Sequence, residues 1–554
     1  MNLVCAHTGP HDGSVSVLND GELFHYIEER FCNTKHAGEV LYGLLEVSKN
    51  CRRIDNLSFS NLFYHLYDFG VYSSILYGLL KVSVPGQADV MIHYEHHYLH
   101  AKTSFCHSGF ENAVVVVIDG AGTTFNYGKE NLTIFDMTKS DGKSLGESKH
   151  LYKSVVGSGS TITCDTPDFV DKNTRIGPGF SYTAVTEALG FNGLDCGKTM
   201  GMSAYGKDNE SIPKLLSIDS SGNDTFKLKE SIILGNNFEG SKYLKVNDLG
   251  SCGSELRRTK FTNKEDLAYR IQLDYEEYLI ETCKKALKLS KYKNLVLTGG
   301  CALNCVANYK LLKSLPEDVT LYADPTCDDS SVSIGGVYHV HHQVDPQKDF
   351  TLKNLYKGRQ MTYNFEYEDQ YHVTPKDIAE LLDMGKVIAI AQGRSEIGPR
   401  ALGNRSILFD PRVKDGKDII NRIKKREEFR PFAGTVLQEH AKEWFDMDRL
   451  DESPFMMYAV DVLPEKIEQI PSIVHVDGTC RVQTVTEEQN KNYYDVITEF
   501  HKITGVPILF NTSFNLAGDT MVDTIEDALC TLHNSEIEYL YLPEISTLVR
   551  VAND

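Results

Sequence analysis

Short apolar runs that stop at an acid or a glycine pair most constrain the fold of this chain. The run at 113–118 ends at Asp119 and a Gly-Ala-Gly loop, and the run at 294–298 ends at Gly299 and Gly300. Runs of this length suit strands, and a glycine loop after a strand lets backbone amides approach an anion such as phosphate. The pattern therefore predicts an α/β protein with phosphate-facing turns.

Other stretches of the chain also predict regular elements. Alternating runs at 14–18 and 22–27 flank Asp20-Gly21, a dipeptide that favours a tight β-hairpin turn. Residues 265–289 have helical periodicity, and residues 377–385 predict a helix that opens a second folding unit.

Length and composition predict the domain organisation. A chain of 554 residues has room for two to four domains. The patterning weakens over 346–363, where Lys, Gln and Asn accumulate, and we interpret this stretch as a linker. We therefore expect one domain over 1–345 and another over 364–554.

The charge balance narrows the range of partners. The chain has 57 Lys and Arg against 77 Asp and Glu, a net charge of −20, which argues against stable binding to duplex nucleic acid. One stretch inverts this balance, because residues 394–430 hold more basic than acidic side chains. Such a stretch suits a compact anion, and a solvated helix face is the alternative.

Compartment and membrane association also follow from composition. No window approaches the roughly 18 consecutive apolar residues of a membrane-spanning helix. The start of the sequence lacks a basic segment followed by an apolar one, so we expect no secretory signal. The 13 cysteines are scattered without a CxxC pair, which argues against a zinc ribbon or a disulfide framework. We expect a reducing, cytoplasmic setting.

Histidine spacing indicates a candidate metal site. His96 and His100 are four residues apart, so on a helix both imidazoles project from one face. Two further pairs, His7/His11 and His93/His97, have the same spacing, and such pairs are common in structural roles. Asp119 at a strand end could complete a two-His, one-carboxylate site, and the acidic loop at 324–331 could add a fourth ligand. Spacing alone leaves the metal and the structural interpretations open.

Glycine-rich segments indicate candidate phosphate contacts. Gly299 and Gly300 precede an apparent helix that begins near Asn304, where a helix N-terminus favours negative charge. A tight turn is the alternative reading of this glycine pair. Residues 197–201 place a lysine between glycines but lack the spacing of a P-loop.

The C-terminal third gathers arginines in and after a glycine-rich stretch at 393–406. The planar guanidinium of arginine matches phosphate oxygens two at a time. Small polar residues at a strand end, Ser513 and Asn515, suit a phosphate or a carbamoyl group. Together these elements favour an anion-binding pocket over scattered surface charge. The basic residues concerned are Arg394, Arg400, Arg405, Lys424, Arg426, Arg430 and Arg481.

These motifs, and their order along nearly the whole chain, resemble those of the O-carbamoyltransferases of the nodulation-factor, cephamycin and tobramycin type. An ordered set of this kind is far more specific than any single member. The matching segments are HDGS at 11–14, EERF at 28–31, KH at 35–36, HHYLHA at 96–101, GKTMGMSAYG at 197–206, GGCALN at 299–304, GRSEIGPRALGNR at 393–405, REEFRPFA at 426–433, HVDGTCRVQ at 475–483 and NTSFN at 511–515.

The resemblance implies a fold and a reaction. The fold is an actin-like (ASKHA) ATPase-fold domain over 1–345, followed by a YrdC-like α/β domain over 364–554. The YrdC-like site would form carbamoyl-adenylate from carbamoyl phosphate and ATP, with Mg²⁺ accompanying ATP. The first domain would hold a divalent metal, Fe²⁺ in related proteins, and pass the carbamoyl group to an acceptor hydroxyl.

The resemblance also assigns roles to residues. The metal ligands would be His96, His100, Asp119 and Asp329, and His11 would act as general base near the acceptor. Lys424 and Arg481 would act in catalysis. The family commonly has glycine where Ser331 stands, so the choice between Asp328 and Asp329 stays open. The residues that would hold ATP, carbamoyl phosphate or the adenylate are Gly299, Gly300, Asn304, Arg394, Arg400, Arg405, Arg426, Arg430, Ser513 and Asn515.

Two other functions remain open at this point. A tRNA threonylcarbamoyladenosine-type transferase uses the same two folds, although a charge of −20 suits tRNA poorly. A non-catalytic ATP-binding protein of the actin type would have no use for the arginine-rich second domain. The acceptor itself, whether a sugar, an antibiotic, a toxin or a hydroxymethylated pyrimidine in a nucleotide or in DNA, is not specified, and neither is the oligomeric state.

Overall fold

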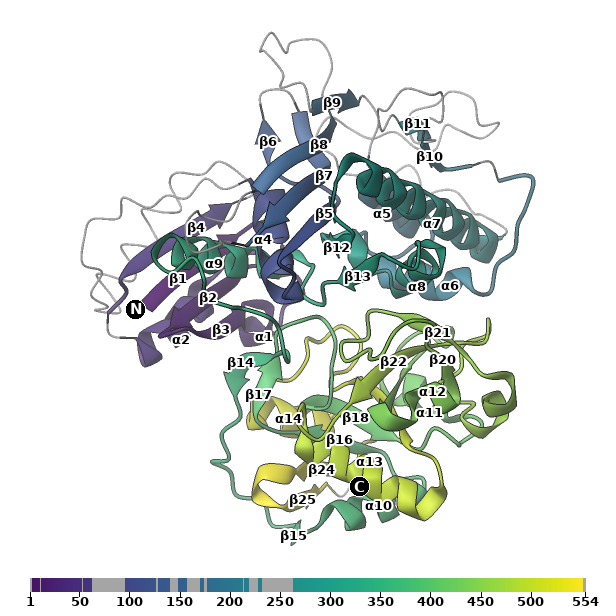
Figure 1. Ribbon diagram of the computed structural model, residues 1–554. Coiled ribbons are helices and arrows are strands. Elements are labelled where there is room, and N and C mark those ends of the chain that lie inside the picture. The colour runs from purple at the N-terminus through teal and green to yellow at the C-terminus, as the bar shows by residue number, and fades with distance from the viewer. Residues whose placement is uncertain are drawn as a thin grey trace. The chain divides into compact units, whose positions relative to one another are not determined.

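The structure is a computed structural model that groups the chain into two compact units (Figure 1). One, which we call the terminal unit, contains residues 1–57, 71–87 and 353–554; the other, the central unit, contains 58–70 and 88–352. This grouping by contacts differs from the predicted division at 345 and 364, which stays a prediction about domains. The described residues are 2–9, 11–51, 53–61, 95–125, 128–139, 148–156, 170–173, 177–212, 214–218, 228–231 and 263–551.

The terminal unit begins with the predicted hairpin, which is confirmed. Asp20 and Gly21 both have positive φ, 47° and 87°, as a two-residue hairpin turn of the primed type requires. The strands follow the order β3-β2-β1-β4, and two helices come after β3. The elements are β1 (Asn2–Thr8), β2 (Ser14–Asn19), β3 (Glu22–Ile27), α1 (Glu29–Cys32), α2 (Leu41–Asn50) and β4 (Asn56–Asn61), and residues 58–61 of β4 are counted in the central unit.

A large mixed sheet forms the rest of the terminal unit. Its described strands are, in spatial order, β15 (Gln370–His372), β25 (Thr547–Arg550), β24 (Tyr539–Leu542), β16 (Ile388–Ala391), β18 (Arg405–Phe409), β23 (Ile508–Ser513), β19 (Ala433–Leu437), β22 (Thr479–Val485), β21 (Ala459–Val462) and β20 (Phe445–Asp446). A separate pair, β14 (Tyr356–Gln360) and β17 (Arg394–Glu396), begins inside the segment predicted as a linker.

Helices accompany this sheet in the terminal unit. They are α10 (Pro375–Asp383), α11 (Gly416–Ile423), α12 (Ala441–Trp444), α13 (Lys491–Thr504) and α14 (Ile525–His533). The helix predicted at 377–385 is confirmed as α10, which starts two residues earlier because Thr374 and Asp377 form a capping box ahead of Pro375. Helix α10 packs against α13.

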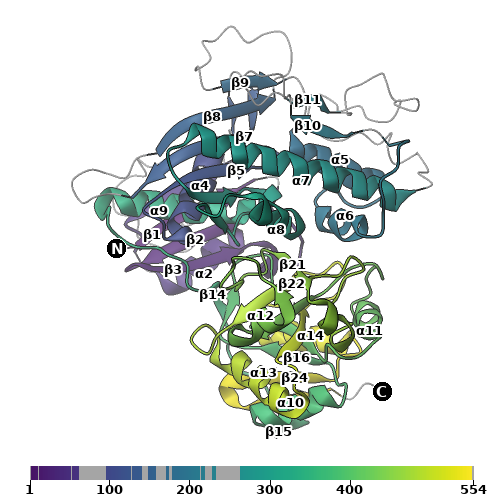
Figure 2. The same ribbon diagram turned by 45° about the vertical axis from the view of Figure 1, so that its right-hand side comes forward.

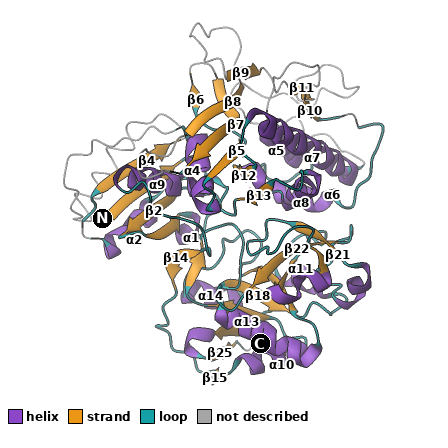
Figure 3. Ribbon diagram, viewed as in Figure 1, coloured by secondary structure: helices purple, strands orange, loops and turns teal. Residues whose placement is uncertain are grey.

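The central unit is built on a second mixed sheet (Figure 3). Both strands predicted from apolar runs are confirmed, β5 (Asn112–Ile118) and β12 (Asn294–Thr298). The described strand order is β13-β12-β5-β7-β8-β9, with β6 paired to β7, and β10 and β11 form a separate pair. The other strands are β6 (Thr124–Phe125), β7 (Gly128–Thr138), β8 (Ser148–Val156), β9 (Val170–Asn173), β10 (Leu216–Ile218), β11 (Leu228–Ser231) and β13 (Thr320–Ala323).

Helices pack on this sheet. Helix α4 packs against β5, β7 and β12, and α7 contacts β5 and the neighbouring helices α5, α6 and α8 (Figure 2). The helix predicted at 265–289 is confirmed as α7. The bounds are α4 (His96–Ser108), α5 (Pro178–Ala188), α6 (Cys196–Ser203), α7 (Lys264–Leu289), α8 (Cys305–Ser314) and α9 (Val332–Val344).

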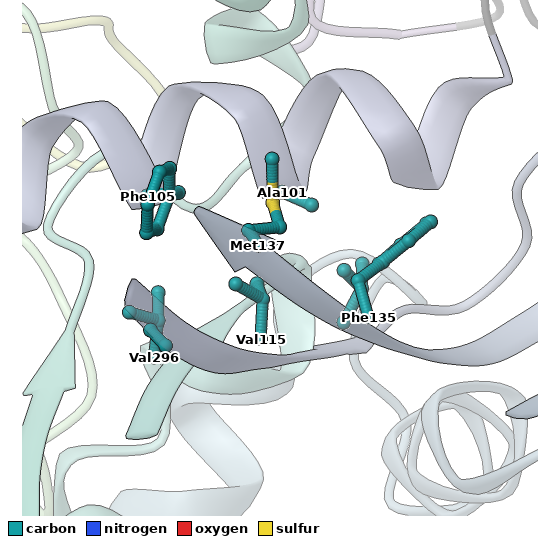
Figure 4. Packing of buried hydrophobic residues seen from close by; sticks show 8 residues of the cluster. Ala101, Phe105, Val115, Phe135, Met137 and Val296 are labelled. Carbon is teal, nitrogen blue, oxygen red and sulfur yellow. The ribbon is translucent and has the colours of Figure 1, made fainter. Parts of the chain in front are cut away.

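An apolar cluster fixes α4 on the sheet (Figure 4). Alternate residues of β5 point to one face, where Val115 packs with Ala101 and Phe105 of α4 and with Met137 of β7. All four side chains are buried. This packing sets the height of α4 above the sheet and so places the histidines at its N-terminal end.

Parallel pairing of β5, β12 and β13 positions the candidate site. The three strands run in the same direction, so their carboxyl ends meet at one edge of the sheet. Asp119, Gly299 and Asp324 each follow directly after one of these strands. The described residues thus combine β-sheets with packed helices in both units, and the predicted α/β fold class is confirmed. Among the described residues, no helix combines the length and the apolar character needed to cross a membrane.

Candidate functional site

The four side chains predicted as metal ligands converge in the central unit. His96 and His100 project from the first turns of α4, Asp119 follows β5, and Asp329 begins a short 3₁₀ turn ahead of α9. The Nε2 atom of His96 lies 3.0 Å from Nε2 of His100, 3.2 Å from an oxygen of Asp119 and 3.3 Å from an oxygen of Asp329. All four residues are buried, although Asp329 lies more than two hundred positions after the other three in the sequence.

The donor set and its spacing fit a divalent metal. The four ligand atoms all lie within 4.8 Å of one another. Donors bound at about 2.1 Å in tetrahedral or octahedral geometry are separated by roughly 3.0–3.4 Å along an edge, which matches the distances around His96. Imidazole nitrogens and carboxylates suit Fe²⁺, Zn²⁺ and similar ions. Two imidazole nitrogens that face each other at 3.0 Å need a shared proton or a shared cation between them.

The electrostatic surroundings shift the pKa values of His96 and its neighbour His97 in opposite directions. Burial lowers the pKa of His96, but the negative charges of Asp329 and Asp119 outweigh it and raise the pKa to about 10. Burial lowers the pKa of His97 to about 4, so this imidazole is neutral, and its Nδ1 lies 2.8 Å from the hydroxyl of Thr133. The cluster thus attracts positive charge, whereas His97 has a packing role.

The other histidine pairs noted in the sequence do not form a comparable cluster among the described residues. His7 is a buried residue of β1, and His93 lies outside the described residues.

The structure distinguishes Asp329 from its neighbour Asp328. An oxygen of Asp329 lies 3.3 Å from Nε2 of His96 and 3.4 Å from Nε2 of His100. The carboxylate of Asp328 instead accepts hydrogen bonds from the backbone amide and the hydroxyl of Ser330, which makes it the cap of the 3₁₀ turn. Asp329 is therefore the residue of this pair that belongs to the candidate metal site.

This difference gives a direct prediction for metal binding. We expect Asp329→Asn to weaken Zn²⁺ binding about 100-fold or more, because a charged ligand is lost. Asp328→Asn should leave the affinity within about twofold, because the amide oxygen can still cap Ser330. Calorimetric titration of both metal-free variants checks this. Equal loss in the two variants would contradict the assignment.

The glycine pair after β12 lies against the carboxylate of Asp119. The Gly300 amide lies 3.2 Å from Asp119 Oδ1, and the Gly120 amide lies 2.8 Å from the same atom. Gly299 has φ of 86°, and a Cβ there would meet the carbonyl oxygen of Ile118 at 2.4 Å. The predicted phosphate turn thus orients a candidate metal ligand in this structure.

Asn304 caps the helix that follows. Its side chain accepts a hydrogen bond from Ala307 at the start of α8 and exchanges hydrogen bonds with Gln272 of α7. The position predicted for nucleotide binding therefore has an N-cap role in this structure.

A second cluster lies in the terminal unit around Lys424, directly after α11. The ammonium donates to the carbonyl oxygen of Asn515 at 2.8 Å, to its side-chain oxygen at 2.9 Å, and to the carbonyl of Ser513. The Ser513 hydroxyl donates to the Asn515 side chain at 2.6 Å. Lys424 is only 2 % exposed, so this buried cation organises the loop after β23.

Cations surround Lys424. Burial, and then the neighbouring charges of Arg426 and Arg430, lower the pKa of Lys424. Arg430 and Arg481 likewise lower the pKa of Arg426, after burial as the larger cause. The Arg426 guanidinium stacks over Phe432 with 4.1 Å to the ring centroid. Like charges held this close favour a bound anion, because an anion relieves their mutual repulsion.

Strand register brings Arg481 to the same region. Ala433 at the start of β19 pairs with Arg481 of β22 on one side and with Asn511 of β23 on the other. Neighbouring strands lie about 4.8 Å apart, so Arg481 and Asn511 are separated by about 10 Å of backbone. Ser513 follows two residues after Asn511. The structure therefore brings together six of the predicted anion contacts, which are Lys424, Arg426, Arg430, Arg481, Ser513 and Asn515.

The arginines of the glycine-rich segment are placed differently. Arg405 is fully buried, and its guanidinium donates to backbone carbonyls, among them those of Asn404 at 3.0 Å and Asp523 at 3.2 Å. It cannot reach a ligand in this arrangement and holds loops together instead. Arg394 stacks over Phe24 at 4.2 Å, and Arg400 is half-buried. In this structure, Arg394 and Arg405 of this motif therefore make packing and backbone contacts.

His11 lies in the loop between β1 and β2 and shares a hydrogen-bond partner, Asp12, with a second histidine. Asp12 holds both rings, with 2.9 Å to Nδ1 of His11 and 2.8 Å to Nδ1 of His36. The hydrogen bond that His36 donates to the Asp12 carboxylate raises the pKa of His36 above its usual value, although burial opposes it. A carboxylate that fixes one ring nitrogen leaves the other nitrogen of His11 in a defined direction.

The loop after α1 joins the N-terminal sheet to the second cluster within the terminal unit. Asn33 accepts hydrogen bonds from the backbone amide and the hydroxyl of Thr520, at 3.2 and 3.0 Å. The Ala517 amide in the same C-terminal loop donates to the carbonyl of Lys424 at 2.9 Å. Lys35, two residues after Asn33, is among the cations that lower the pKa of Lys424. Sequence reasoning did not assign Lys35 to this cluster.

Comparison with known proteins identifies the class of enzyme. Residues 46–338 match the carbamoyltransferase N-terminus family, and residues 379–548 match the carbamoyltransferase C-terminus family. The two matched segments contain the candidate metal ligands and the cluster around Lys424. Both families are parts of group-transfer enzymes. The chain belongs to the carbamoyltransferase family.

Two curated relatives and a solved structure illustrate the similarity. The chain is 29% identical to nodulation protein NolNO of Sinorhizobium fredii, over 96% of this chain and 78% of that protein. It is 32% identical to nodulation protein NolO of Bradyrhizobium diazoefficiens, over 80% of this chain and 77% of that protein. A crystal structure of full-length HypF in its phosphate- and nucleotide-bound form is similar over 62% of this chain and 56% of that chain, with 13% identity and a TM-score of 0.40.

Proposed function

We propose that this carbamoyltransferase is an O-carbamoyltransferase that uses carbamoyl phosphate and ATP. The cluster around Lys424 would make carbamoyl-adenylate, and an acceptor hydroxyl would then receive the carbamoyl group. The observation that carries the proposal is a group of neighbouring basic side chains inside the segment that matches the carbamoyltransferase C-terminus, in which Arg426 and Arg430 lie near Lys424 and Arg481 lies near Arg426. Clustered cations of this kind suit a doubly or triply charged phosphate ligand.

The first half-reaction would take place in two steps. Water cleaves carbamoyl phosphate to carbamate and phosphate, and a carbamate oxygen then attacks the α-phosphorus of ATP. The bond to the β-phosphate breaks, so carbamoyl-adenylate forms and pyrophosphate leaves. Arg481 and Arg426 would stabilise the charge that develops on the phosphates, with Mg²⁺ accompanying ATP. Ser513 and Asn515, held by Lys424, would orient the carbamoyl group.

The second half-reaction transfers the carbamoyl group to an alcohol. The acceptor oxygen attacks the carbamoyl carbon, the bond to AMP breaks, and AMP leaves. His11, oriented by Asp12, would take the hydroxyl proton. His96, His100, Asp119 and Asp329 would hold a divalent metal, Fe²⁺ in related proteins. When bound, this ion supplies Lewis-acid stabilisation of a carbonyl or phosphate oxygen.

The two alternative functions are less well supported. Membership of the carbamoyltransferase family leaves a non-catalytic actin-type protein without support. The net charge of −20 disfavours tRNA as a partner of a threonylcarbamoyladenosine-type transferase. The candidate acceptors are a hydroxylated small molecule and a hydroxymethylated pyrimidine. Screening such compounds for a mass gain of one carbamoyl group would identify the acceptor.

Pyrophosphate release tests the proposal. We expect release from ATP that requires carbamoyl phosphate and no amino acid. A requirement for threonine and bicarbonate instead of carbamoyl phosphate would favour the tRNA-modifying alternative. Absence of release with either set of substrates would contradict carbamoyl-adenylate formation. Omitting carbamoyl phosphate is the matched control.

A further inference from the structure

The start of helix α4, which carries two candidate metal ligands, is capped by residues outside the helix. Its N-cap residue Glu95 makes no capping hydrogen bond. The His96 amide instead donates to the Thr123 hydroxyl at 2.8 Å, and the His97 amide donates to the carboxylate of Glu130 at 3.1 Å. The first amides of a helix lack partners within the helix and attract a carboxylate. Thr123 and Glu130 therefore fix where α4 begins.

Glu130 also holds the loop that carries Asp119. The same carboxylate oxygen accepts a hydrogen bond from the Thr123 amide at 3.0 Å, and the Gly122 amide donates to the Glu130 carbonyl at 2.8 Å. The neighbouring Asn131 carbonyl accepts the Asp119 amide at 3.1 Å. A Cβ at Gly122 would lie 2.5 Å from Cγ of Glu130, so only glycine allows this approach. One carboxylate thus contacts both the helix with the histidines and the loop with the aspartate.

A buried lysine neutralises Glu130. Lys153 of β8 is fully buried, and its ammonium lies 3.0 Å from the second carboxylate oxygen of Glu130 and also contacts Glu95. Burial alone would raise the pKa of Glu130, but the charge of Lys153 and the hydrogen bonds from the Thr123 and His97 amides outweigh it and lower the pKa to about 2. Burying two opposite charges costs free energy, because both must be removed from water. The attraction between them offsets this cost only when their geometry is good.

We propose that Glu130, paired with Lys153, is a positioning residue that joins two of the three segments that supply the metal ligands. One segment is the start of α4 with its two histidines, and the other is the loop after β5 with Asp119. The inference rests on the metal site of the proposed function and extends it to residues that touch no ligand. Groups behind metal ligands typically alter metal affinity about 10- to 100-fold when they are removed.

Zn²⁺ affinity of the metal-free full-length protein tests this role without any turnover. We expect Glu130→Ala to raise the Kd for Zn²⁺ about 10- to 100-fold, because the helix start and the Asp119 loop lose their common anchor. Thr123→Val, which removes the single bond to the His96 amide, should cause a smaller increase. Competition with a chelator of known affinity gives the Kd, and thermal unfolding of each metal-free variant reports on folding.

A rescue variant separates positioning from general stability. Lys153→Met should weaken Zn²⁺ binding, since it leaves Glu130 buried without its cation. The double variant Glu130→Gln, Lys153→Met keeps an oxygen that can accept both amides and leaves no unpaired charge at these two positions. We therefore expect it to recover most of the affinity. Failure of the double variant to bind better than Glu130→Ala would overturn the proposal.

Arg270→Met is the matched control, because Arg270 pairs with the buried carboxylate of Asp274 in the same unit, on helix α7. It should lower the unfolding temperature while leaving the Kd for Zn²⁺ within about twofold. An equal loss of affinity in this control would assign the effect of Glu130→Ala to general destabilisation and overturn the proposal. Absence of Zn²⁺ binding by the unmodified protein would refute the metal site itself, whereas normal binding by every variant would refute only the role of Glu130.

Discussion

Arg481→Ala is expected to lower carbamoyl-phosphate-dependent pyrophosphate release about 100- to 1000-fold, and with it all carbamoyl transfer. The proposal uses this guanidinium to stabilise charge that develops on phosphate during adenylate formation, and loss of one such donor has this magnitude in other enzymes. Both half-reactions stop because the second depends on the product of the first. A coupled pyrophosphate assay at saturating ATP and carbamoyl phosphate measures the effect.

The control for this variant is Arg422→Ala. Arg422 lies in the last turn of α11, close in sequence to the cluster, but its side chain is 67 % exposed and pairs with Glu536. Its removal should leave pyrophosphate release within about twofold, because exposed ion pairs contribute little. If Arg481→Ala made pyrophosphate normally and lost only carbamoyl transfer, the assignment of adenylate formation to the C-terminal cluster would be wrong.

His11→Asn is expected to lower carbamoyl transfer to the acceptor about 100- to 10 000-fold while pyrophosphate release stays near the unmodified level. General base catalysis by a positioned imidazole contributes rate factors of this size. Asparagine can still hydrogen-bond to Asp12 but takes no proton at neutral pH. Single-turnover measurements that follow pyrophosphate and carbamoylated acceptor in the same sample separate the two steps.

His440→Asn is a closely matched control. Like His11, His440 is a partly exposed residue of the terminal unit whose Nδ1 lies close to a carboxylate, here Glu443 at 3.2 Å. Its replacement should change neither half-reaction. Equal loss of both steps in His11→Asn would show that His11 acts in adenylate formation, and unchanged transfer would remove it from the mechanism.

Three of the four candidate metal ligands could be predicted from local patterns in the sequence. A four-residue spacing on a helix brings His96 and His100 together, and an acid at the end of a strand points into the edge where parallel strands finish. The choice between Asp328 and Asp329 could not be made in this way. It depends on which carboxylate caps the turn and which faces α4.

The arginine-rich segment shows where sequence reasoning fails. Arg405 and Arg426 lie in similar basic stretches, yet Arg405 is fully buried among backbone carbonyls and Arg426 stacks beside other cations. A guanidinium has five N–H donors that serve a phosphate or a set of carbonyls equally well. Burial decides between these roles, and it arises from strand order in the sheet.

No pattern in the sequence indicated that Glu130 and Lys153 form a buried ion pair. They lie on β7 and β8, and their contact depends on the register of two long antiparallel strands that contain a bulge. A charged residue in an alternating strand normally predicts a solvent-facing position. The same limit applies to residues 1–57, whose contacts with β14, β17 and the loop at Thr520 join segments that are far apart in the sequence.

The most direct test is the fate of a labelled carbamoyl group in the absence of an acceptor. The purified protein would be mixed with ¹³C-labelled carbamoyl phosphate, ATP and Mg²⁺, and its nucleotide products would be resolved by rapid-quench mass spectrometry. The account predicts AMP that carries one labelled carbamoyl group, formed together with an equal amount of pyrophosphate. Formation of ADP and phosphate alone, with no label on any nucleotide, would contradict it.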